Sequence, residues 1–101
     1  MYILVAPNGV LALHDSDNMR AFSIVLGSPD AALSELAKIG VLADDKDHYW
    51  LEVDAVEELS ARIHDQQWLQ DFRAMLVSAA PYGFYDETTN KVKAHVETAD
   101  A

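Results

Sequence analysis

The first fourteen residues constrain the fold most, because they carry no formal charge. Two apolar runs, residues 2–6 and 10–14, are separated by Pro7-Asn8-Gly9. Proline presets the first central position of a turn, and asparagine and glycine tolerate the conformations that follow it. The segment therefore predicts an N-terminal β-hairpin. Since apolar side chains occupy both faces of the first strand, we expect cover on both sides, from helices or a second subunit.

Three helices are predicted after the hairpin. The Ser-Pro-Asp triplet at 28–30 has the cap, first-position proline and first-turn acid of a helix start, and Gly40 is placed as its left-handed C-terminal cap. Asp54 and Glu57 resemble a capping box, and Asp65 is placed to cap a further helix. The expected helices span residues 29–39, 54–64 and 65–80.

Alternating apolar and polar residues predict the remaining strands, near 48–53 and 91–96. Residues 19–26 fit a helix or a strand, and their Ile-Val pair favours a strand. The expected fold class is α+β: a mainly antiparallel sheet, made of the hairpin and these strands, packed by two to three helices. We expect one domain over residues 1–97 and a frayed tail at 98–101.

Composition excludes several classes of protein. The chain has 101 residues and no cysteine, which rules out disulfides, thiolate nucleophiles and cysteine metal sites. No apolar run approaches the roughly 20 residues that span a bilayer, and the N-terminus lacks the features of a signal peptide. We therefore expect a cytoplasmic protein with no membrane partner.

The acidic residues are clustered. Seven of the seventeen fall between residues 44 and 58, where Lys46 is the one base, giving 1 − 7 = −6 of the formal net charge of −10. Such a surface repels phosphate backbones and attracts basic proteins over a Debye length of about 8–10 Å. The charge predicts no nucleic-acid partner and permits a basic protein partner.

A partner-binding surface is predicted around Trp50, which the alternation places on the polar side of its strand. Tryptophan is enriched among the residues that anchor interfaces. The acids of this stretch without a predicted structural role are Asp44, Asp45, Asp47 and Glu58. We expect a non-enzymatic, acidic protein-interaction module that acts as a homo-oligomer, with a homodimer as the default symmetry. A plainly solvated loop is the alternative.

No catalytic, cofactor or metal motif stands out. The four histidines have no i, i+4 spacing, and the glycines are scattered rather than gathered in a phosphate-binding loop. If there is a reactive site, the first candidates are His14, Asp15 and Asp17, because loops beyond strand ends often carry function. No cofactor and no metal are expected, and the sequence favours a protein that is not an enzyme.

Two alternatives stay open. One is a small-molecule-binding protein or small enzyme, with a pocket between the sheet and helix 65–80 and with His14 or His48 as its polar group. The other is an acidic inhibitor or immunity-type protein for a basic partner, which the composition permits.

Overall fold

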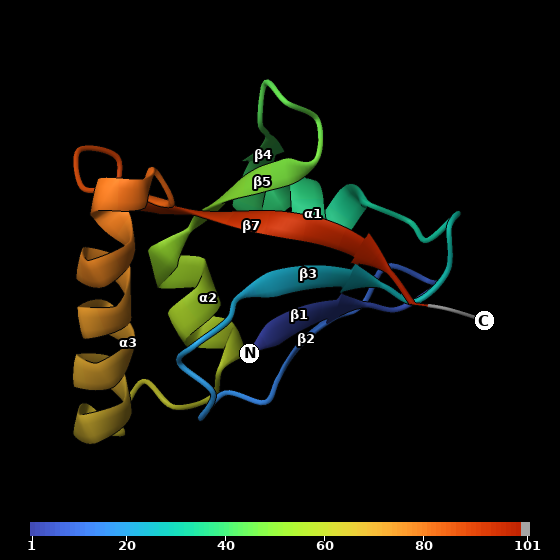
Figure 1. Ribbon diagram of the computed structural model, residues 1–101. Coiled ribbons are helices and arrows are strands. Elements are labelled where there is room, and N and C mark those ends of the chain that lie inside the picture. Colours follow the sequence, from blue (N-terminus) through green and yellow to red (C-terminus); the bar gives the residue numbers. More distant parts are fainter. Residues whose placement is uncertain (100–101) are drawn as a thin grey trace.

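Seven strands form one mixed sheet, with the last of them near its centre (Figure 1). In this computed structural model, which describes residues 1–99, the strands are β1 (Tyr2–Val5), β2 (Leu11–His14), β3 (Ser23–Leu26), β4 (Gly40–Leu42), β5 (His48–Glu52), β6 (Tyr85–Asp86) and β7 (Lys91–Thr98). Their order is β2-β1-β3-β7-β5-β4, and β6 also pairs with β7. The pairs β1–β3 and β3–β7 are parallel and the other four are antiparallel. The predicted α+β class with a mainly antiparallel sheet is confirmed.

The helices lie on one side of the sheet. They are α1 (Ser34–Ile39), α2 (Val53–Leu59) and α3 (Gln66–Ala79), followed by the short 3-10 helix η1 (Ala80–Tyr82). In Figure 1, α1 and α2 lie behind the strands and α3 stands at one end of the sheet. The hydrophobic core fills the space between, and fully buried members include Ile3, Ile24, Leu36, Leu51 and Phe72.

The N-terminal hairpin is confirmed. Its turn is closed by hydrogen bonds from the Gly9 N–H to the Ala6 oxygen (2.7 Å) and from the Ala6 N–H to the Val10 oxygen (3.0 Å). Gly9 has a φ of +94°, which only glycine adopts without strain. The helices cover one face of these strands. Of the two covers considered for the other face, no helix layer is present among residues 1–99, and cover by a second subunit stays a prediction.

The helix predicted for residues 29–39 begins later, at Ser34. The Ser-Pro-Asp triplet forms a turn instead, in which the Ala31 N–H donates to the Ser28 oxygen at 3.1 Å. Gly40 is not a left-handed cap: it is extended, with φ −166°, and begins β4. A Cβ at this position would lie 2.6 Å from the Trp50 carbonyl oxygen. Glycine is therefore required here because β4 lies close against β5. The local sequence did not reveal that β4 pairs with β5 at the edge of the sheet.

The helix predicted for residues 54–64 is also shorter. No side chain caps its N-terminus, so the predicted capping box of Asp54 and Glu57 is wrong. Glu57 is buried and instead accepts hydrogen bonds of 3.1 and 3.3 Å from Arg73 on α3. The helix ends at Leu59, and Ala61, just beyond it, has a φ of +57°.

Two further expectations are settled by the described residues. Asp65 caps α3 as predicted, since its carboxylate accepts the Trp68 N–H at 3.1 Å. The predicted fraying at 98–101 is wrong for its first residues: Thr98 pairs with Leu26, and the Ala99 N–H donates to the Leu26 oxygen at 2.9 Å. Residues 100–101 lie outside the described residues. Of the ambiguous segment 19–26, only β3 is a strand.

Candidate interaction surface

The sheet has a second face, turned away from the helices, which we call the open face. Strand alternation and the pairing register assign its side chains, because directly paired residues point to the same side. They are Tyr2, Leu4, Ala12, His14, Ser23, Val25, Val41, His48, Trp50, Glu52, Asp86, Lys91, Lys93, His95 and Glu97. The assignment of Trp50 to the side opposite Leu51 agrees with the sequence prediction.

One half of the open face, over β2, β1 and β3, is apolar. Leu4 pairs with Val25 on β3, and Tyr2 pairs with His14 on β2. The Tyr2 and His14 rings stack with their centroids 5.3 Å apart. Tyr2, Leu4 and Val25 are half-buried. Half-buried apolar side chains still expose apolar area, and burial of that area by a partner would stabilise a complex.

The other half, over β7 and β5, is aromatic and charged. The Lys93 ammonium lies 5.7 Å from the centre of the Trp50 ring, a cation–π distance. His48 contacts two further rings, His95 at 5.2 Å and Phe84 at 6.2 Å between centroids. The sequence reasoning missed Lys93 and Phe84. The polar phase of residues 91–97 gave a signal for Lys93, whereas the ring contact of Phe84 depends on long-range packing.

Asp45 connects the acidic loop to this half of the face. One carboxylate oxygen accepts the backbone N–H groups of Asp47 (2.9 Å) and His48 (3.2 Å). The other lies 2.9 Å from His48 Nδ1 and 3.4 Å from Lys93 Nζ. The contact to Nδ1 is close, yet it lacks the alignment of a hydrogen bond, and no other described atom bonds this buried nitrogen. The Asp47 N–H, followed by His48 and Lys93, lowers the pKa of Asp45.

Of the other acids predicted for partner binding, Asp44 and Asp47 share a loop with Asp45, whereas Glu58 is separate from them. Asp44 and Asp47 have exposed side chains in the loop between β4 and β5. Glu58 is exposed on α2, in the helix layer rather than on the open face. The structure therefore links Trp50 to Asp45 through Lys93 and leaves two acids on the neighbouring loop.

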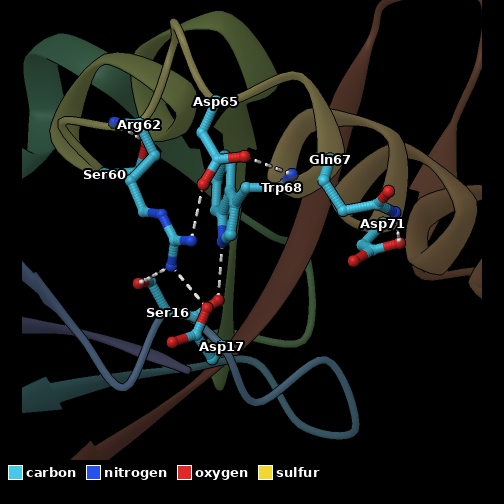
Figure 2. A network of polar contacts seen from close by, with 8 residues as sticks. All are labelled: Ser16, Asp17, Ser60, Arg62, Asp65, Gln67, Trp68 and Asp71. Atoms are coloured by element: carbon cyan, nitrogen blue, oxygen red, sulfur yellow. Dashed lines mark hydrogen bonds and ion pairs between the residues drawn. The ribbon is translucent and has the colours of Figure 1, made fainter.

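The three candidates for a reactive site have separate surroundings. His14 is exposed on the open face, and Asp15 lies 4.0 Å from the α-amino group of Met1. Asp17 pairs with Arg62, whose guanidinium also bonds Asp65 at 2.7 Å (Figure 2). Asp17 thus has a structural partner, and the three side chains do not converge on one point.

Arg62 also donates to the Ser16 hydroxyl at 3.3 Å. Figure 2 shows that its guanidinium contacts both the loop after β2 and the residue that caps α3. The hydrogen bonds that Arg62 donates to Asp65 and Asp17 raise the pKa of Arg62. The Arg62 hydrogen bond, followed by the Trp68 N–H, lowers the pKa of Asp65. This network fixes the loop after β2 against the start of α3, which is a structural role.

Possible metal sites and pockets also bear on function. Among residues 1–99, no group of three or more His, Asp or Glu side chains is placed to hold a metal ion. A pocket of about 350 Å³ lies where α3 meets the end of the sheet, the region in which the sequence permitted a ligand site. Neither His14 nor His48 lines it.

Comparison with known proteins gives no relative: no family, no curated protein sequence and no solved structure matches this chain. Within the described part of the chain, no helix has the length and apolar character needed to cross a membrane. The geometry of the open face is therefore the basis for a functional proposal.

Proposed function

We propose that this protein is a non-enzymatic interaction module that forms a homodimer through the open face. The observation that carries the proposal is the row of half-buried apolar side chains, Tyr2, Leu4 and Val25, on the side of the sheet opposite the helices. Trp50, with Lys93 over its ring, continues the surface on the other half. Two such faces packed together would form a two-layer sandwich with sheets about 10 Å apart.

The charge distribution supports a second copy as the occupant. The open face carries two lysines and three acids, so its formal charge is 2 − 3 = −1, while the rest of the chain carries −10 + 1 = −9. Two copies that meet through this face keep most of their negative charge apart. Contacts through other surfaces would bring those like charges together, at a cost in free energy.

Symmetry explains how one face serves both partners. In a two-fold dimer the same patch is used twice, so it must be complementary to itself. The open face offers apolar side chains on β1 and β3 beside cationic and acidic ones on β7, among them Lys93 and Glu97. A two-fold axis parallel to the sheet and perpendicular to its strands would place apolar area on apolar area and pair charges at the rim.

Analytical ultracentrifugation from 1 to 100 µM tests the dimer. We expect the wild type to approach twice the chain mass of 11.2 kDa. Trp50→Asp and Val25→Lys should each weaken association at least tenfold, because they place charge on the interface. Val77→Asp is the matched control, since Val77 is 60% exposed on α3, in the helix layer.

Circular dichroism of each variant shows whether it is folded. A wild type that stays monomeric up to 100 µM would overturn the proposal. So would folded Trp50→Asp and Val25→Lys variants that dimerise as tightly as Val77→Asp.

The acidic loop supports a second contact, to a basic protein. Asp44 and Asp47 are exposed there, whereas Asp45 is engaged with His48 and Lys93. Double reversal of Asp44 and Asp47 to lysine should weaken binding to cytochrome c at low ionic strength by at least fivefold. Double reversal of Asp30 and Asp71, both exposed, changes the net charge equally and should have a smaller effect. Equal weakening by both pairs would show that net charge alone, rather than this loop, attracts the basic protein.

A further inference from the structure

The 350 Å³ pocket arises where β7 changes neighbours. Along one edge, β7 pairs first with β6, at Lys91 and Val92, and then with β3, from His95 onward. Between these pairings the Phe84 oxygen accepts the Lys93 N–H at 2.8 Å. The segment before β3 and the second half of α3 enclose the space that β6 and β3 leave unfilled. The pocket is thus a product of the strand order.

The walls of the pocket are mainly apolar. Met19 and Phe22 come from the segment before β3, Met75 from α3, and Phe84 from the segment before β6. Methionine side chains adapt to ligands of different shape, and they make favourable contacts with aromatic rings. The volume lies near the lower end of the range of roughly 300–1,000 Å³ for ligand pockets, so it suits one ring or a short alkyl chain.

The charge at the pocket has the opposite sign to the chain. None of the sixteen acidic residues in the described part of the chain lines the pocket, whereas two of the seven cationic ones, Arg20 and Lys93, do so. The Lys93 ammonium is engaged with Asp45 at 3.4 Å. Arg20 is exposed and forms no ion pair among residues 1–99. A guanidinium can bind a carboxylate with two parallel hydrogen bonds.

We infer that this pocket binds a small amphipathic carboxylate, with its ring or alkyl chain among Met19, Phe22, Met75 and Phe84 and its carboxylate on Arg20. The pocket shares Lys93 with the open face, but Arg20 and the apolar lining lie at the end of the sheet, on the segments before β3 and β6 and on α3, so the inference does not need the dimer. Apolar burial supplies affinity, and Arg20 selects the charged head group.

Isothermal titration and methionine methyl NMR with octanoate test the inference, and octanol serves as a ligand with the same tail and no charge. We expect saturable octanoate binding that shifts the methyl signals of Met19 and Met75. Arg20→Ala should weaken octanoate binding about tenfold and leave octanol binding unchanged, because one charge-assisted contact is lost. Lys46→Ala is the matched control. It removes the same charge, and Lys46 is exposed in the β4–β5 loop, away from the pocket.

A second variant tests the apolar part of the site. Ala79→Leu adds volume inside the pocket and should reduce binding of both ligands by at least fivefold. The inference is overturned if octanoate causes no saturable shift, or if folded Arg20→Ala and Lys46→Ala variants bind it equally well. Octanoate binding and chain mass are separate measurements, so a wild type that stays monomeric in the ultracentrifuge leaves the ligand test valid.

Discussion

The indole N–H of Trp68 donates a 2.7 Å hydrogen bond to the backbone carbonyl oxygen of Ser16, 52 residues earlier in the chain. Trp68 is 2% exposed, and its ring stacks on Phe72 with centroids 5.0 Å apart. One side chain therefore fills the core and also fixes the loop after β2. This contact links the loop after the N-terminal hairpin directly to α3.

Replacement of Trp68 by phenylalanine should lower the free energy of unfolding by about 1–3 kcal/mol, because the Ser16 carbonyl loses its donor and the core loses volume. Urea denaturation followed by circular dichroism measures the change. Trp50→Phe, on the open face, serves as the control and should cost less than about 0.5 kcal/mol in the monomer. Equal losses in the two variants would contradict the role assigned to this hydrogen bond.

Asp65→Asn separates charge from capping, because asparagine still accepts the Trp68 N–H at the start of α3. Asp65 has a pKa below its ordinary 3.8, chiefly through Arg62. A lowered pKa in the folded state stabilises the protein above about pH 4, and this contribution is lost as pH falls through the lowered value. The thermal midpoint of the wild type should thus exceed that of Asp65→Asn at pH 7, and the gap should narrow below pH 4.

Asp71→Asn provides the reference for that pH series, since Asp71 is exposed and bonds only Gln67 among the described side chains. Its midpoint should follow the wild type across the range. A gap for Asp65→Asn that stays constant down to pH 2 would rule out an ionic contribution from the Arg62 pair.

Arg73→Met should destabilise the fold by about 1–2 kcal/mol, because it leaves the buried Glu57 carboxylate without its donors. The double variant with Glu57→Leu should recover part of that loss, since both polar groups are then gone. Chemical denaturation of the two single variants and the double variant gives the coupling energy. Additive losses would mean that the two side chains act independently.

Gly40→Ala should cost about 1–3 kcal/mol, because the new methyl group would lie 2.6 Å from the Trp50 oxygen and 2.7 Å from Leu51 Cδ2. Val41→Ala on the same strand is the control, as Val41 is 55% exposed. Backbone amide exchange should also show that β4 separates from β5 in the glycine variant. An alanine variant as stable as the wild type would mean that β4 shifts to admit the methyl group at no cost.

The sequence predicted the elements whose signals are local. Pro7-Asn8-Gly9 specified the hairpin, Asp65 specified the start of α3, and the alternation at 48–53 assigned Trp50 and Leu51 to opposite faces. Each of these signals depends on neighbours within a few residues, which the sequence displays directly.

The elements that depend on distant partners were not predicted. β4 exists because β5 lies beside it, so Gly40 was mistaken for a helix cap. Glu57 was assigned to the start of α2, but its partner is Arg73, sixteen residues later. The same limit applies to the site: Trp50 was identified by alternation, whereas the engagement of Asp45 with Lys93 needs the β5–β7 pairing.

The central place of β7 has a consequence for how the chain folds as it leaves the ribosome. β7 is the last strand described, and it joins the β2-β1-β3 half to the β5-β4 half. Until residues 91–98 emerge, the nascent chain therefore exposes the unpaired edges of β3 and β5. Contacts between residues so far apart in sequence slow folding, and such exposed edges pair readily with other chains. The two halves of the sheet should thus join only after residues 91–98 have left the ribosome.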